Sequence, residues 1–176
     1  MSVLIEAVSL VVPRVLLELR YPDGKNGFFA EMSRPSAEAR YVCADCHLVS
    51  ASFFTPEAAE RAAAVLVSAG MLDVEDDQYR DFALVDQKYG PLLHCHWLIW
   101  SPHPTGYTSA WLAGTDKAAL ATPDGWTVAQ SLRLMRTEVS AITGDILELS
   151  EDNGIVTWLD FRSGRVHSSL RRERAG

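Results

Sequence analysis

The chain has 176 residues, of which 48% are hydrophobic and 22% are charged. This length fits one domain or two small halves that share a core, and the composition is that of an ordinary globular protein, which excludes extended disorder and coiled coil. The formal net charge is −7, from 16 basic and 23 acidic residues.

The charge is unevenly distributed along the chain. Residues 1–161 contain 11 basic and 22 acidic residues, whereas residues 162–176 contain five arginines and one glutamate. An acidic body repels phosphate backbones, so we expect no nucleic-acid partner. The basic tail either contacts an anionic partner or forms weak local ion pairs in solvent.

Hydropathy and cysteine content indicate the compartment. No stretch approaches the roughly 20 apolar residues of a membrane-spanning helix, and residues 1–12 lack the basic leader of a secretion signal. We therefore expect no membrane association and a cytoplasmic location. Three cysteines do not make a disulfide framework, and a reducing compartment would keep Cys43, Cys46 and Cys95 as thiols or metal ligands.

The first part of the chain predicts a strand, two short helices and a hairpin. Residues 3–12 are rich in β-branched side chains and predict a strand. Residues 14–32 have helical spacing that Pro22-Asp23-Gly24 divides into two pieces. Residues 40–43 and 47–54 predict two strands of a hairpin.

The next helix along the chain has the clearest local signal. Thr55-Pro56-Glu57 combines an N-cap hydroxyl, a proline suited to the first helical position and an acidic residue that favours the helix dipole, and Gly70 predicts the end of this helix. Residues 82–85 then predict a strand. The order βαββαβ is that of the ferredoxin-like arrangement, which we expect for residues 1–90.

The remainder, residues 91–176, is predicted to be mainly β. A short helix is expected over 127–135, and a three-stranded meander ends the chain, with turns at Asn153-Gly154 and Ser163-Gly164. We therefore expect an α+β fold in which the two halves form separate domains or one compact domain together. The predicted strands of this half are 98–100, 108–113, 118–121, 146–149, 155–161 and 165–170.

Four short segments carry a resemblance to known proteins. They are Ser2-Val3-Leu4-Ile5-Glu6-Ala7, Tyr41-Val42-Cys43-Ala44-Asp45, Phe53-Phe54-Thr55-Pro56-Glu57-Ala58 and Pro123-Asp124-Gly125-Trp126. Together they resemble a group of uncharacterised bacterial proteins over most of the chain. The resemblance implies a bacterial protein, but it carries no activity, substrate or catalytic residue that could be transferred.

Two segments hold all three thiols and suggest a zinc site. If they meet in the fold, Cys43, Cys46, His94 and His96 provide a tetrahedral Cys₂His₂ set, because two histidines at alternate positions of a strand share a face. The alternative is that Cys43 and Cys95 are small buried side chains and that the histidines face solvent. On this alternative no cofactor is expected.

An acidic segment and an aromatic group are the candidate binding residues. Residues 73–81 contain five carboxylates, but the pattern departs from a calcium-binding EF-hand because Gln78 stands where glycine is needed. This segment could attract a basic partner. The aromatic side chains could line a pocket or anchor a partner. The candidate partner- or ligand-binding residues are Trp97, Trp100, Tyr107, Trp111, Asp76 and Asp77.

Nucleotide-binding and hydrolase motifs are missing from the sequence, so no catalytic residue is predicted. We therefore expect a non-catalytic protein-interaction module of the antitoxin or immunity-protein kind. The alternative is a zinc-binding protein or metal-dependent enzyme that uses the Cys43/Cys46 and His94/His96 group. Exposed sheet edges also make a homodimer a candidate assembly.

Overall fold

The computed structural model describes residues 1–117, 119–128, 131, 146–152, 155–160 and 166–170. The chain divides into two compact units, Met1–Arg133 and Leu134–Gly176. Helices and mixed sheets together confirm the predicted α+β class. Within the described residues, no helix is both long enough and apolar enough to cross a membrane.

The first unit contains a five-stranded sheet in the order β3-β4-β2-β7-β8. Every pair of neighbouring strands in it is antiparallel. The hairpin predicted near residues 40–54 is confirmed as its first two strands. The bounds are β3 (Ala39–Ala44), β4 (Leu48–Phe53), β2 (Val8–Pro13), β7 (Ala83–Asp86) and β8 (Gly90–Pro91).

A four-stranded sheet has the order β11-β1-β10-β9. Its pairing is antiparallel except between the first two strands of that order, which run parallel. A two-stranded hairpin completes the β structure of this unit. The bounds are β11 (Leu120–Ala121), β1 (Ser2–Ile5), β10 (Thr108–Leu112), β9 (Leu98–Pro102), β5 (Val74–Glu75) and β6 (Gln78–Tyr79).

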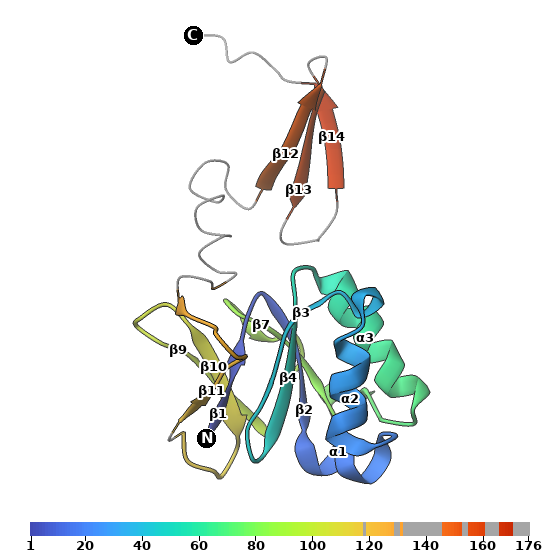
Figure 1. The fold of residues 1–176 in the computed structure, drawn as a ribbon, viewed down its shortest axis with the longest axis vertical. Coiled ribbons are helices and arrows are strands. Elements are labelled where there is room, and N and C mark those ends of the chain that lie inside the picture. The colour runs from blue at the N-terminus through green and yellow to red at the C-terminus, as the bar shows by residue number, and fades with distance from the viewer. Residues whose placement is uncertain (118, 129–130, 132–145, 153–154, 161–165, 171–176) are drawn as a thin grey trace. The chain divides into compact units, whose positions relative to one another are not determined.

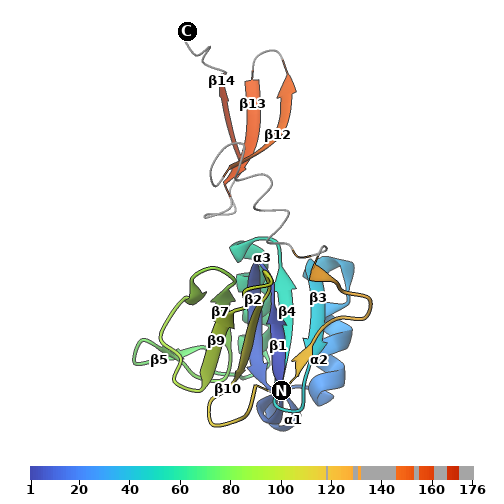
Figure 2. The same cartoon turned by 90° about the vertical axis from the view of Figure 1, so that its left-hand side faces the viewer.

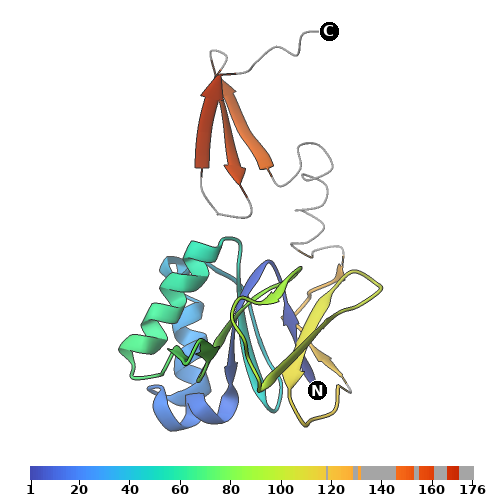
Figure 3. The same cartoon turned by 180° about the vertical axis from the view of Figure 1, so that it is seen from behind.

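The helices are α1 (Arg14–Arg20), α2 (Gly24–Met32) and α3 (Pro56–Ser68), with a 3₁₀ turn at Pro35–Ala37. They cover one face of the five-stranded sheet, and the four-stranded sheet lies on its other side (Figure 1 and, from behind, Figure 3). Apolar side chains from all three layers form the core, including Phe28, Phe53 and Phe82, which are fully buried.

The single strand predicted over residues 3–12 is wrong, because two strands occupy it. The chain breaks between β1 and β2 at Glu6 and Ala7, where Ala7 has a positive φ of 46°. Gln87 holds the break: its side-chain Oε1 accepts from the Ala7 N–H at 2.9 Å, and its own N–H donates to the Ala7 carbonyl at 2.8 Å. The break lets one segment contribute a strand to each sheet.

The helices predicted within residues 14–32 and after Thr55 are confirmed. The segment 14–32 forms α1 and α2, separated at Tyr21–Asp23, and Asp23 has a positive φ of 55°. At the start of α3, the Thr55 Oγ1 accepts from the Ala58 N–H at 3.3 Å, with Pro56 at the first helical position. Gly70 follows its end with a φ of +91°.

The second unit contains a three-stranded sheet in the order β12-β13-β14 with antiparallel pairing. The first pair has a register shift between Glu148 and Ser150. Most of the helix predicted over 127–135, and both predicted turn dipeptides of this region, lie outside the described residues. The strand bounds are β12 (Ile146–Asp152), β13 (Ile155–Asp160) and β14 (Val166–Leu170).

Candidate functional site

The acidic segment, residues 73–81, contains the β5–β6 hairpin. Asp76 and Asp77 make its two-residue turn with positive φ angles of 51° and 59°. Two successive left-handed residues characterise the tight turns that match strand twist, and aspartate tolerates this conformation better than most side chains. Figure 2 shows the hairpin at the side of the unit next to β7 and β9. Both turn carboxylates are exposed.

Part of the acidic charge of this hairpin is paired. Arg80 forms a salt bridge with Glu75. The buried Asp81 carboxylate pairs with Arg20 and also accepts from the Leu72 N–H at 2.9 Å. Asp76 and Asp77 form no salt bridge with any described residue. The turn therefore presents two carboxylates to solvent.

Next to the hairpin, the chain from Tyr89 to the start of β9 exposes large apolar side chains. Tyr89, Leu92 and Leu93 are 58%, 49% and 40% exposed. These side chains help to line an open hollow of about 370 Å³. Its lining residues are Tyr89, Pro91, Leu92, Leu93, His94, Cys95, Leu98 and Trp100.

The wall of this hollow depends on a close approach of backbone to an indole ring. Gly90 has a φ of +87°, and a Cβ added there would lie 2.3 Å from the Trp100 Cε2. Only glycine permits both this backbone conformation and this contact. Trp100 is therefore held against the β8 backbone, which fixes one wall of the hollow.

A second hollow of about 390 Å³ lies between the hairpin and the same segment. A backbone hydrogen bond joins the two, since the Tyr79 N–H donates to the His94 carbonyl at 2.9 Å. We call the exposed side chains of Asp76, Asp77, Tyr89, Leu92 and Leu93 the acidic–apolar surface. The second hollow is lined by Glu75, Asp76, Gln78, Arg80, His96 and Trp97.

The aromatic residues singled out in the sequence occupy separate places. Trp97 lines the second hollow and Trp100 the first. Tyr107 lines neither: its ring stacks on His103 with centroids 4.4 Å apart and planes at 8°. Trp111 also lines neither, and the Lys117 ammonium lies 4.7 Å from its ring centroid. Of these four residues, only Trp97 and Trp100 therefore adjoin the acidic–apolar surface.

The proposed zinc ligands lie at or beyond opposite edges of the five-stranded sheet. Cys43 is in β3, one edge of the five-stranded sheet, and the exposed Cys46 lies in the turn that follows. His94 and His96 follow β8, the opposite edge. Within the part of the chain that the structure describes, no three His, Cys, Asp or Glu side chains are grouped as a metal ion requires.

Burial distinguishes the thiols. Burial is the main cause that raises the pKa of Cys43 to about 12 and the pKa of Cys95 to about 11, so both stay protonated near neutral pH. His94 and His96 are exposed on either side of the buried Cys95. They lie in a bridge and a turn rather than at alternate positions of one strand.

A buried polar network was not foreseen from the sequence. Glu6 is fully buried at the break between β1 and β2, and its Oε2 accepts from the Ser131 hydroxyl at 3.1 Å. The Ser9 hydroxyl donates to the Glu6 carbonyl at 3.1 Å and lies 2.9 Å from the Ser52 hydroxyl. The signal was a glutamate in an apolar run, which is costly to bury unless it is hydrogen-bonded. We interpret the network as holding the strand break.

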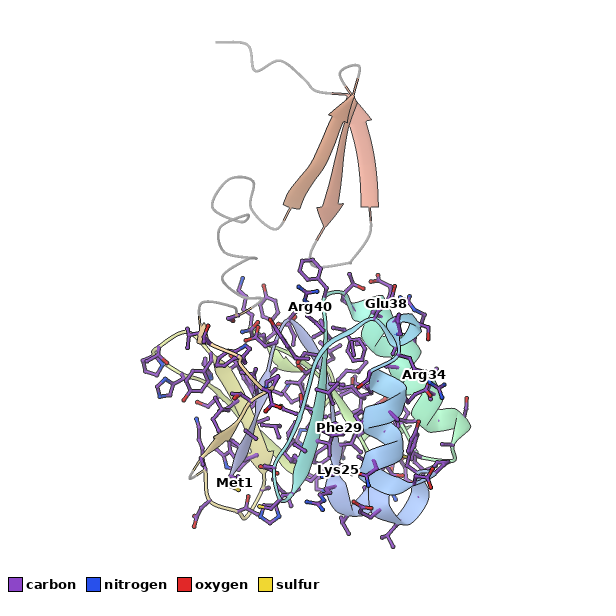
Figure 4. The ribbon with its side chains drawn as sticks, in the orientation of Figure 1. Met1, Lys25, Phe29, Arg34, Glu38 and Arg40 are labelled. Atoms are coloured by element: carbon purple, nitrogen blue, oxygen red, sulfur yellow. The ribbon has the colours of Figure 1, made fainter. Side chains whose placement is uncertain are left out.

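The side of α2 differs from the acidic–apolar surface. There the Lys25 ammonium lies 5.8 Å from the Phe29 ring centroid, and Arg34 pairs with Glu31 at 2.6 Å (Figure 4). Glu38 pairs with Arg61. Charges of both signs are therefore interspersed and paired on this side.

Two features thus meet at one place on the first unit, an exposed apolar group around a hollow and a carboxylate-bearing hairpin turn. Neither contains a grouping of nucleophile, base and orienting group of the kind that acyl transfer needs. Comparison with known proteins adds no relative: no protein-family model, no curated protein and no solved structure matches this chain.

Proposed function

We propose that the chain is a non-catalytic protein-interaction module of the antitoxin or immunity-protein kind, and that the acidic–apolar surface is its interface. The observation that carries the proposal is the exposure of Tyr89, Leu92 and Leu93 around one hollow. Contiguous exposed apolar groups mark interaction sites on soluble proteins, because water contact with them is unfavourable.

The chemistry of the surroundings supports this proposal. Protein interfaces combine an apolar centre with a polar rim, and their binding energy comes mainly from a few anchors seated in pockets. Here the first hollow supplies the pocket, and exposed carboxylates lie at the neighbouring second hollow, which Asp76 lines, with Asp77 next to it in the turn. Trp100, held by Gly90, makes the pocket preorganised, which lowers the entropic cost of binding.

We extend the proposal to the architecture. The strand order β3-β4-β2-β7, its antiparallel pairing and the helices between β2 and β3 and between β4 and β7 favour a ferredoxin-like arrangement within residues 1–90. The order β12-β13-β14 favours a terminal meander in the mainly β half. In this arrangement the ferredoxin-like sheet ends at β8, where the proposed interface begins.

The setting that we propose is the bacterial cytoplasm. Cys43, Cys46 and Cys95 are all free, which suits a reducing compartment. The bacterial origin comes from the resemblance of the four sequence segments described above.

The test is site-specific photo-crosslinking in the full chain, expressed in a bacterial host. A photoreactive side chain at Leu92 is compared with the same side chain at Leu19 of α1, which is 74% exposed and apolar. We expect one protein to cross-link at Leu92 and not at Leu19. That protein is then purified, and its affinity for the chain is measured directly.

The double change Leu92→Asp with Leu93→Asp should weaken this affinity by about 100-fold, because it places charge in the apolar centre. Leu19→Asp should leave it unchanged. Equal binding by the double variant and the wild type would remove the proposal. A cross-link to a second copy of the chain instead identifies the surface as a homodimer interface.

The alternative, zinc binding, makes a different prediction. It requires stoichiometric zinc in the purified protein and loss of that zinc in Cys46→Ser. Metal analysis that gives this result contradicts the interaction-only function. A metal-free protein whose melting temperature is unchanged by added zinc removes the alternative.

A further inference from the structure

We infer that the partner presents a basic segment with one bulky apolar side chain, which enters the hollow beside Leu92 while the basic residues lie over the Asp76-Asp77 turn. This inference rests on the proposed function, because it names the chemistry of the partner at the same surface. It is carried by the charge of the hairpin, the shape of the first hollow and the contact between the two.

The first feature that favours such a partner is the negative charge of the β5–β6 hairpin. Residues 73–81 contain five carboxylates and one arginine. Glu75 and Asp81 already have arginine partners, so the negative potential of the hairpin comes from Asp73, Asp76 and Asp77, all of which are exposed. A partner of matching charge is basic, and opposite charge increases the rate of encounter and excludes acidic competitors.

The second feature is the first hollow, which can accept one apolar side chain of the partner. The first hollow has a volume of about 370 Å³, at the lower end of the roughly 300–1,000 Å³ of ligand pockets. Its lining includes the apolar side chains of Leu92, Leu93, Leu98 and Trp100, and Leu92 and Leu93 are also exposed to solvent. One tryptophan, phenylalanine or leucine side chain from a partner fits such a site and would be the main source of affinity.

The third step is the spacing of the two features. The hairpin and the apolar segment are joined at His94, so the two hollows flank one short stretch of chain, His94 to Trp97. A single continuous segment can therefore contact both. Lys88 lies at the other end, with its ammonium 5.0 Å from the Tyr89 ring centroid. Basic residues of the partner are therefore favoured at the hairpin end of the surface and disfavoured at the Lys88 end.

The experiment is selection from a random dodecapeptide phage library on the full chain. The same selection is made on Asp76→Asn with Asp77→Asn, which removes two charges but keeps residues that tolerate positive φ. We expect the wild type to enrich peptides with a net positive charge and one bulky apolar residue. The Asn variant should lose the preference for basic residues.

Synthetic versions of the enriched peptides are then measured by fluorescence polarisation. Replacing the bulky residue by alanine should weaken binding by at least about 30-fold, and the Asn variant should bind about three- to tenfold more weakly at low ionic strength. High salt should remove that second difference. No enrichment on the wild type, or enrichment of neutral or acidic peptides, overturns the inference.

The natural partner separates this inference from the proposed function. If its binding is lost in Leu92→Asp with Leu93→Asp but is unchanged in the Asn variant at low salt, the interface stands and the basic partner is refuted. If both variants bind as the wild type does, the interface itself is refuted. Equal melting temperatures of the three proteins control for the fold.

Discussion

Two of the three thiols lie where a negative charge is unfavourable. Cys43 and Cys95 are buried, and their raised pKa values express the cost of a thiolate without water around it. Since the thiolate is the nucleophile and the metal ligand, buried thiols of this kind are inert at neutral pH. Cys46 is exposed and is the reactive candidate among the three.

The raised pKa of Cys43 predicts a loss of stability at alkaline pH. The thiol has a pKa near 9.0 in the unfolded chain and about 12 in the folded protein, so above pH 9 the unfolded chain releases a proton that the folded protein keeps. The stabilisation is complete below pH 9, and the free energy of unfolding should then fall by about 1.4 kcal/mol per pH unit for this thiol. Urea unfolding at a series of pH values measures the slope.

The control for this prediction is a pair of alanine variants. Cys43→Ala should reduce the alkaline slope by the share of one proton, whatever it does to stability at neutral pH. Cys46→Ala, the same substitution at an exposed position, is the matched variant for comparison. A Cys43→Ala protein with an unchanged slope contradicts the assignment.

For single residues, the sequence gives the chemical type of each side chain but does not settle whether that side chain is buried or exposed. Burial of Cys43 and Cys95 and exposure of His94 and His96 were one of two alternatives open from the residue pattern. The exposure of Leu92 and Leu93 was not predicted, because composition alone favours burial of leucine. What exposes them is the short connection between two sheet edges, which is a tertiary feature.

The start of α3 shows how much a local signal can fix. Thr55 supplies the cap, Pro56 the first helical position and Glu57 a charge in the first turn. Removing the hydroxyl in Thr55→Ala leaves the Ala58 N–H without its acceptor, and we expect a loss of about 1 kcal/mol in the free energy of unfolding. Thr55→Ser keeps the acceptor and should lose less than half of this. Chemical denaturation followed by far-UV circular dichroism measures both, and equal losses would be evidence against the cap.

The contact between β8 and β9 predicts a difference between two glycines. Gly90 and Gly114 both have positive φ, +87° and +82°, but an added Cβ meets Trp100 at the first and nothing within 4 Å at the second. Gly114→Ala should cost about 1–2 kcal/mol of stability from backbone strain alone. Gly90→Ala should cost a further 1–3 kcal/mol, roughly, because the indole ring must move.

Thermal and urea unfolding of the two variants measure this difference. Gly90→Ala should also weaken binding at the acidic–apolar surface, since Trp100 forms a wall of the first hollow. Similar losses of stability in the two variants would show that the ring yields easily and does not define the hollow.

Elements were predictable where their signals are contained in the chain itself. The division of 14–32 by proline and glycine and the cap of α3 are such signals, and both predictions are confirmed. The break between β1 and β2 is not, because its cause is the partner of each half: β1 pairs with β10, whereas β2 pairs with β4 and β7. The β5–β6 hairpin also lacked the usual glycine signal, since two aspartates form its turn.

At the scale of the whole molecule, β1 pairs with strands that are distant from it in the sequence. β1 lies between β10 and β11, so strands on both sides of residue 90 form one sheet. Glu6 connects this segment with Ser131 at 3.1 Å. The compact unit accordingly extends from Met1 to Arg133. The position of the boundary between the two units therefore depends on long-range strand pairing, which local sequence patterns do not reveal.

This organisation predicts how fragments behave. A fragment of residues 1–133 keeps every partner of β1 and should unfold in one cooperative urea transition with a well-dispersed NMR spectrum. A fragment of residues 1–90 lacks β10 and β11 and would expose Val3, Leu4 and Ile5, which are at most 1% exposed in the folded protein. Burying each such side chain contributes about 1.5–3 kcal/mol, so the three together contribute about 4.5–9 kcal/mol, which is comparable with the whole stability of a small domain. We therefore expect the shorter fragment to be unfolded or aggregated. A cooperative transition for residues 1–90 alone would instead show that the ferredoxin-like half is an independent domain that does not need the partners of β1.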